Sequence, residues 1–125
     1  MAITHASDIR NALCDYVVDA VDRGAGAGKV IFMTSSDVTV ATATCADPAF
    51  GSASGGTATA NPLTSLPDAI GGEVSKFKVV DSNGATIFQG SAGLSGSGAD
   101  AIISNTTIGA GETVTVNSLS YTAPL

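Results

Sequence analysis

From residue 29 onward, the sequence alternates apolar residues with small polar ones in short segments that turn-forming residues separate. A period of two is typical of β-strands that bury one face, and regularly spaced turns between such segments are typical of a sandwich or barrel. The segments are Lys29–Thr34, Val38–Cys45, Thr57–Leu63, Glu73–Val80, Thr86–Gln89, Ala101–Ile108 and Thr113–Tyr121. We therefore predict a mainly β fold, an antiparallel β-sandwich or barrel of about 6–7 strands with one N-terminal α-helix.

Two local signals refine this prediction. Asp81-Ser82-Asn83-Gly84 separates two alternating segments. An Asn-Gly pair in that position predicts a β-hairpin, because both residues tolerate positive φ. In the last segment, the alternation of apolar and polar residues shifts by one position between Val116 and Leu119, so these two side chains would fall on opposite faces of a regular strand. This change predicts a β-bulge near Asn117-Ser118.

The loops carry two low-complexity stretches, Gly51–Gly56 and Ser91–Ala99. They are either simple connectors or mobile loops at one end of the sandwich. The stretch Asp47-Pro48-Ala49-Phe50-Gly51 predicts a turn, and we expect Phe50 to anchor this turn in the core.

Residues 7–23 predict an amphipathic helix, with Ser7 as its cap and Gly24 as its end. At about 100° per residue, one side of this helix is apolar and the nearly opposite side is acidic. The apolar side consists of Ile9, Leu13, Tyr16, Val17 and Ala20, and the acidic side of Asp8, Asp15, Asp19 and Asp22. We expect the apolar side to pack on the body and the acidic side to face outward. The acidic face is either simply solvated or a docking face for a basic partner.

A chain of 125 residues fits a single domain, 1–125, with the helix at 7–23 and a β-sandwich over 29–125. A net charge of −6 argues against direct nucleic-acid binding, because phosphate contacts need clustered Lys and Arg. Neither a secretion signal nor an apolar run of the ~20 residues that span a bilayer is present, so we predict no membrane insertion and assembly in a cytosol-like compartment.

The residues needed for catalysis or metal binding are scarce. His5 is the one histidine, so any Ser-His-Asp or Cys-His arrangement would have to use it, and its place near the N-terminus favours a solvated terminal residue instead. Cys14 and Cys45 are the two cysteines, and we expect both to be free, buried thiols. We therefore predict a protein that is not an enzyme, with no catalytic, cofactor-binding or metal-binding residues and no cofactor.

Three weak motifs have simpler explanations. Asp81–Gly84 is similar to the start of a calcium loop but lacks the later ligands, so the hairpin is favoured. Gly24–Lys29 is similar to a phosphate-binding loop, yet a helix precedes it and a strand follows, the reverse of the required order. Asn105-Thr106-Thr107 fits a glycosylation acceptor, but without a secretion signal a polar strand segment is favoured.

Most of the chain resembles a family of small phage and prophage structural proteins that is associated with head and particle genes. The segments that carry the resemblance are Asp8–Leu13, Lys29–Met33, Asp47–Gly51, Gly56–Asn61, Phe77–Gly84 and Asn105–Leu119. Members of this family often have a Trp or Tyr near the strand that contains Phe77, which this chain lacks.

The resemblance implies a virion component, and a capsid decoration or cement protein on the head exterior fits best. The implied partner is the major capsid protein of the phage head, bound by a homotrimer that assembles in the host cytoplasm. The alternatives are a tail or head–tail connector protein, and a small surface fibre or carbohydrate-binding module. A lysis enzyme is the remaining alternative, which the lack of a catalytic set disfavours.

Overall fold

The computed structural model describes residues 3–23, 26–46, 48–65 and 69–123. Its helix, α1, spans Ser7–Ala20. The strands are β1 (Lys29–Met33), β2 (Thr39–Thr44), β3 (Thr57–Thr59), β4 (Thr64–Ser65), β5 (Gly72–Glu73), β6 (Lys76–Val80), β7 (Thr86–Gly93), β8 (Ala101–Ile103), β9 (Thr107–Ile108) and β10 (Val116–Thr122). The predicted class, a mainly β fold with one N-terminal helix, is confirmed.

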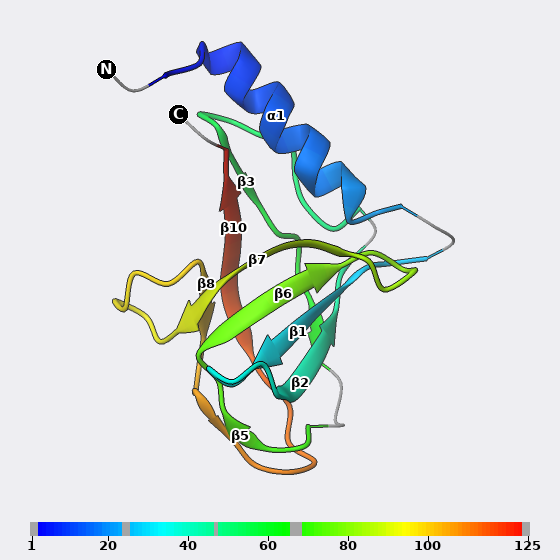
Figure 1. Ribbon diagram of the computed structural model, residues 1–125, viewed down its shortest axis with the longest axis vertical. Helices are drawn as coiled ribbons and strands as arrows, with labels where there is room; N and C mark the ends of the chain where they lie inside the picture. Colours follow the sequence, from blue (N-terminus) through cyan, green and yellow to red (C-terminus); the bar gives the residue numbers. More distant parts are fainter. Residues whose placement is uncertain (1–2, 24–25, 47, 66–68, 124–125) are drawn as a thin grey trace.

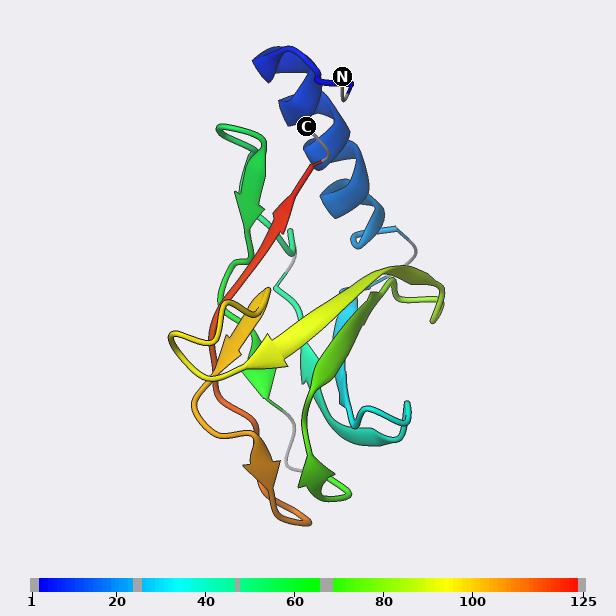
Figure 2. The same cartoon turned by 60° about the vertical axis from the view of Figure 1, so that its left-hand side comes forward.

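Eight of the strands form one sheet in the order β3-β10-β8-β7-β6-β1-β2-β4, and β5 and β9 form a separate pair. The eight-stranded sheet curls on itself as an open half-barrel (Figures 1 and 2). Its neighbouring strands are antiparallel except β7 and β8, which are parallel through Ala92 and Gly93. The molecule is elongated, with α1 and both chain ends at one end and β5 at the other (Figure 1).

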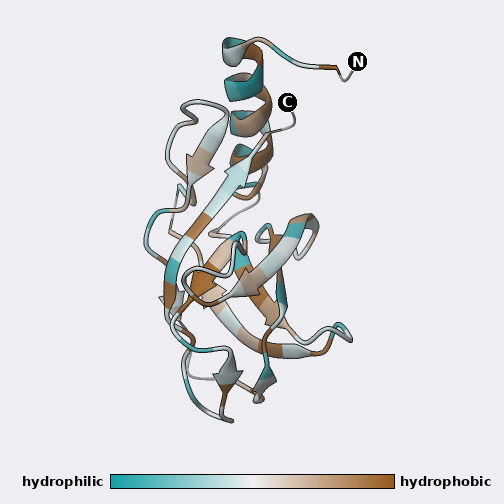
Figure 3. Ribbon diagram, turned by 90° about the vertical axis from the view of Figure 1, so that its left-hand side faces the viewer, coloured by the Kyte–Doolittle hydropathy of each residue, from teal (hydrophilic) through white to brown (hydrophobic). Residues whose placement is uncertain are grey.

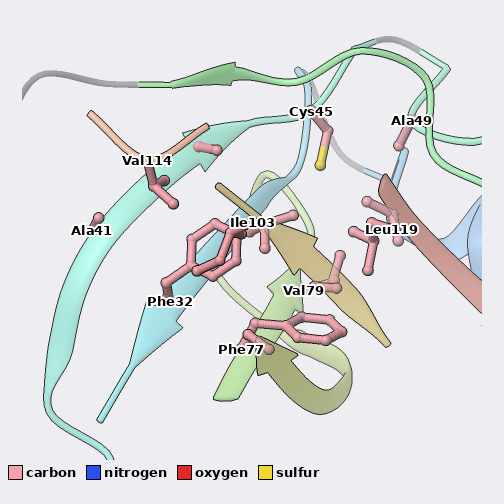
Figure 4. Packing of buried hydrophobic residues seen from close by; sticks show 14 of the residues in the cluster. Phe32, Ala41, Cys45, Ala49, Phe77, Val79, Ile103, Val114 and Leu119 are labelled. Atoms are coloured by element: carbon pink, nitrogen blue, oxygen red, sulfur yellow. The ribbon is translucent and has the colours of Figure 1, made fainter. Parts of the chain in front are cut away.

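The core lies inside the curl of the sheet and is formed by buried side chains from its strands and from α1. Phe32 of β1 is opposite Phe77 of β6, and both side chains are fully buried. Ile103 and Leu119 from β8 and β10 meet them from the other side of the curl (Figure 4). As predicted, Phe50 is buried and belongs to this cluster, in a tilted contact with the ring of Phe88.

The predicted hairpin joins β6 to β7. Its turn adopts positive φ only at Gly84, not at Asn83, because the Asp81 carboxylate organises the loop by accepting hydrogen bonds from the N–H groups of Asn83 and Ala85. The register shifts by one residue between Val79 and Val80. The predicted bulge in β10 is confirmed by a register shift between Val116 and Ser118.

Several boundaries differ from the prediction. The segment expected as one strand over 101–108 divides into β8 and β9, and Asn105 lies in the bend between them, where its side chain accepts the N–H of Thr107. The strand predicted from Val38 begins at Thr39 because Asp37 turns the chain with a positive φ of 68°. Asp47 of the predicted turn lies outside the described residues.

The helix also differs at both ends. Ser7 is its first residue rather than its cap, and Ala6 takes the capping position without a side-chain hydrogen bond. The helix ends at Ala20, three residues before the predicted end, and the chain continues in a turn over Val21 and Asp22. Gly24, the predicted terminator, lies outside the described residues.

Candidate docking surface

The helix is fastened to the body by polar side chains. Asn11, Asp15 and Asp22 lie on one side of α1 and the turn that follows it, and their side-chain oxygens accept hydrogen bonds from the backbone N–H groups of Gly56, Ala53 and Ala49, at 2.8, 2.8 and 2.9 Å. The 49–56 loop therefore runs antiparallel to the helix. We call Asn11, Asp15 and Asp22 the polar anchors. They satisfy three backbone donors of a loop that has few strand partners of its own.

Further contacts on the same side complete the attachment. Cys14, Val18 and Val21 are buried against the body, and the Cys14 thiol donates to the Tyr121 carbonyl oxygen at 3.5 Å. The Arg10 guanidinium donates to the carbonyl oxygen of Ala123 at 3.2 Å. It also lies against Gly56, where a Cβ atom would be 2.6 Å from the guanidinium carbon. A glycine at position 56 thus permits the close approach of Arg10.

The orientation of the helix differs from the prediction. Ile9, Leu13 and Tyr16 were expected in the core, but 48%, 39% and 78% of their surface is exposed. Val17 and Ala20 are half-buried. Of the four aspartates expected to face solvent, Asp8 and Asp19 are exposed as predicted, whereas Asp15 and Asp22 contact the body as polar anchors. The prediction assumed that the polar side of the helix is solvated by water. In the structure, polar side chains on that side instead accept hydrogen bonds from backbone N–H groups that would otherwise have no partner.

We call Ile9, Leu13 and Tyr16 the outer stripe. These side chains follow each other at four- and three-residue intervals, so they form one apolar row on the side of α1 away from the sheet. Figure 3 shows hydrophobic residues recurring along the helix as well as in the strands. Two exposed carboxylates, Asp8 and Asp19, flank the row along one side.

A shallow hollow of about 220 Å³ lies at the C-terminal end of the outer stripe, lined by Tyr16, Asp19, Ala20 and Arg23. The Arg23 side chain forms one wall and is held in place from two directions. Its Nε donates to the Ala20 carbonyl oxygen at 3.3 Å, and its terminal nitrogen lies 3.5 Å from the buried carboxylate of Asp81. The hairpin that was considered as a calcium loop thus positions this arginine.

A second hollow, of about 210 Å³, lies where β7 and β10 separate beyond the short β8. Its apolar wall is formed by Phe77, Phe88 and Tyr121, whose rings contact one another through Phe88 at centroid distances of 6.2 and 5.0 Å. Its polar wall is formed by Gln89, Asp100, Ser120 and Thr122. The sequence prediction missed this aromatic group, since its members are 11 and 33 residues apart and only the topology brings them together.

The remaining candidate residues line neither of the two hollows. His5 is exposed at the start of the described chain. Within ranges 3–23, 26–46, 48–65 and 69–123, no three His, Cys, Asp or Glu side chains are close enough to hold a metal ion. Lys29 is the first residue of β1, and the preceding Gly28 packs against Val21 and Val80, so this segment does not open a helix.

Both thiols are free and buried, as predicted. Burial is the main reason that the pKa of Cys45 rises to about 11, and the nearby Asp22 carboxylate raises it further. Burial also raises the pKa of Cys14, assisted by Asp15. A raised pKa keeps both groups as thiols rather than thiolates at neutral pH, so neither is activated as a nucleophile.

No protein-family model matches this chain, and no curated protein or solved structure matches it significantly. The described helix is too short to cross a bilayer. The outer stripe of α1, with its acidic flank and adjoining hollow, is therefore the candidate site that the geometry itself supplies.

Proposed function

We propose that this protein is a non-enzymatic structural component of a phage particle, a capsid decoration or cement protein that binds the outside of the head. The observation that carries the proposal is the outward-facing outer stripe on a helix that three side-chain hydrogen bonds attach to the β body. Exposed apolar rows of this kind mark surfaces that bind other proteins. The resemblance to small phage structural proteins supports the choice of a virion partner.

The physical basis of cementing is avidity. Each copy can bind modestly because many copies act together over a shell, and bridging between shell subunits raises the effective concentration of each contact. A homotrimer fits this role, since it matches the local three-fold axes of a shell and makes three contacts at once. The partner in this proposal is the major capsid protein, and assembly takes place in the host cytoplasm.

The test is to mix the purified protein with expanded shells that lack it, with free capsid subunits and with tails. We expect saturable binding to shells at hundreds of copies per particle, little binding to free subunits, and greater resistance of decorated shells to heat. Binding to tails, or about a dozen copies per particle, would show that the protein is a connector instead.

The proposed lack of enzymatic activity is tested separately. The protein is assayed against peptidoglycan, nucleic acid and simple esters. Turnover that a single substitution in the aromatic hollow abolishes, for example Asp100→Asn, would refute this part of the proposal.

One observation favours a second function, that of a carbohydrate-binding surface module. The hollow between β7 and β10 combines half-buried rings, Phe88 and Tyr121, with polar side chains, a pairing typical of sugar sites. A Tyr16→Phe variant leaves Tyr121 as the one tyrosine of the chain, because the sequence contains two. Titrating this variant with common monosaccharides should change its tyrosine fluorescence saturably if the hollow binds sugars, and an unchanged signal up to tens of millimolar would exclude them.

A further inference from the structure

We infer that the outer stripe of α1 inserts into an apolar groove with a basic rim, on a protein other than a second copy of this chain. The inference rests on the proposed function, in that it names the chemistry of the surface to which the protein docks. It begins from the exposure of Ile9, Leu13 and Tyr16, which share one side of a helix that already has its other side filled.

The spacing of the stripe suits a groove rather than a flat surface. Anchors at i, i+4 and i+7 are how an amphipathic helix occupies a hydrophobic groove. The stripe covers two turns, roughly 10 Å of helix at 1.5 Å per residue. The hollow beside Tyr16 and Ala20 is a depression next to the stripe. A side chain from the partner's groove can enter it.

The charges beside the stripe indicate the rim of the partner. Asp8 and Asp19 are both exposed and lie on the same side of the helix, about 16 Å apart along its axis. The neighbouring cations are engaged by the body itself. The side chain of Arg23 is 59% exposed, but its terminal nitrogen lies 3.5 Å from the Asp81 carboxylate, and Arg10 donates to the Ala123 carbonyl oxygen. The flank of the stripe is therefore acidic, and Lys or Arg side chains on the partner complement it.

The same charges disfavour a second copy of this chain. In a two-fold antiparallel pair of stripes, each centred between Ala12 and Leu13, Asp8 of one helix lies within about 3 Å of Asp19 of the other along the helix axis, and the same pair recurs at the other end. Like charges in such positions repel. A parallel pair places the two helix dipoles side by side in the same direction, which is also unfavourable. Trimer contacts in the proposed assembly therefore use another surface.

The helix is also prepared for binding before any partner arrives. The polar anchors fix it at three points along the 49–56 loop, so docking does not have to order it. A flexible segment binds more weakly because its backbone and side chains must become ordered on binding. A helix that is already fixed does not have this entropic cost.

The experiment compares two charge-matched variants, Leu13→Asp on the stripe and Leu94→Asp elsewhere, where 47% of the Leu94 surface is exposed. Each substitution removes one exposed leucine and adds one negative charge. Circular dichroism checks that both fold. In binding to expanded shells, Leu13→Asp should weaken the affinity at least about tenfold and Leu94→Asp less than about twofold. Equal effects of the two variants would overturn the inference while leaving the proposed function intact.

The basic rim is tested by a double variant, Asp8→Lys with Asp19→Lys. It should bind shells more weakly than the wild type, and its affinity should depend less on salt between 50 and 300 mM. An unchanged salt dependence would contradict the basic rim.

A shell-free measurement separates the inference from the proposed function. On a resin that carries both phenyl and quaternary ammonium groups, Leu13→Asp should elute at lower salt than Leu94→Asp, although their net charges are equal. If the wild type fails to bind shells but this difference appears, the proposed function is wrong and the stripe chemistry holds. If sedimentation shows a dimer that Leu13→Asp abolishes and Leu94→Asp does not, the stripe pairs with itself and the inference is refuted.

Discussion

The orientation of α1 can be tested by truncating one residue on each side of it. Val18 is 2% exposed and packs on the body, whereas Leu13 is 39% exposed and belongs to the outer stripe. Hydrophobic periodicity alone predicts that Leu13 is the core residue. The structure predicts that Val18→Ala is the more damaging change, even though it removes fewer carbon atoms than Leu13→Ala.

The magnitudes follow from burial. Val18→Ala removes two buried methyl groups, and their transfer to water is worth about 0.8 kcal/mol each. The cavity left behind adds to this, so we expect a loss of about 2–3 kcal/mol in the free energy of unfolding. Leu13→Ala leaves no cavity in the body, and alanine has the higher helix propensity, so we expect a loss below about 1 kcal/mol.

The assay is urea unfolding, followed by far-UV circular dichroism for both variants under the same conditions. The slopes with urea should match that of the wild type, which shows that only stability has changed. If Leu13→Ala loses more than about 2 kcal/mol while Val18→Ala stays near the wild type, then the helix packs through its apolar stripe and the docking surface described above does not exist.

Three other predictions concern the attachment of the helix and the core. Gly28→Ala should destabilise the protein by about 1–3 kcal/mol in thermal or urea unfolding, because its Cβ would be 2.5 Å from the Val80 carbonyl oxygen, while Gly26→Ala, with open space around it, should be nearly neutral. Asp15→Ala should cost about 1–3 kcal/mol by leaving the Ala53 N–H unpaired, whereas Asp19→Ala, on the exposed side, should change stability little; equal effects would contradict the role of the polar anchors. The folded state favours the protonated thiol of Cys45, whose pKa is raised from 9.0 to about 11. The contribution of this group to the free energy of unfolding should therefore be constant below pH 9.0 and should fall as the pH rises from there toward about 11. Cys45→Ser should remove part of this fall.

Local patterns located most of the strands, because apolar and polar residues alternate in a half-buried strand, but they did not show that the segments Glu73–Val80 and Ala101–Ile108 each divide into two strands. The bulge in β10 was visible as a change of phase, and the β6–β7 hairpin as an Asn-Gly pair. These features depend on residues close together in the chain. The aromatic hollow does not, since Phe77 and Tyr121 meet only after β8 has brought β7 and β10 to neighbouring positions.

The helix shows where such reasoning fails. Amphipathicity reveals two sides but not which one faces the body, because that depends on what the body offers. In this protein the body presents backbone N–H groups that lie between 27 and 45 residues after the helix side chains that accept their hydrogen bonds. The one signal was the spacing of Asn11, Asp15 and Asp22, which places three short hydrogen-bond acceptors on one side. Such residues are common enough on solvated helices that the spacing alone does not identify a contact.

The parallel pairing of β7 and β8 was also missed. Parallel neighbours normally need a long crossover, because the chain must return along the full length of a strand. Here only Ala92 and Gly93 pair with β8, so the chain has to return by about two residues, or roughly 7 Å. The short loop over residues 94–100 is sufficient for that distance.

The order of the sheet has a consequence for behaviour at high concentration. Its outermost strands are β3, with three residues, and β4, with two. Long exposed edges recruit further strands from other molecules and lead to fibrils, whereas edges of two or three residues offer too few hydrogen bonds to hold a foreign strand. Within the described residues, outer strands as short as these disfavour edge-to-edge polymerisation of the protein at high concentration.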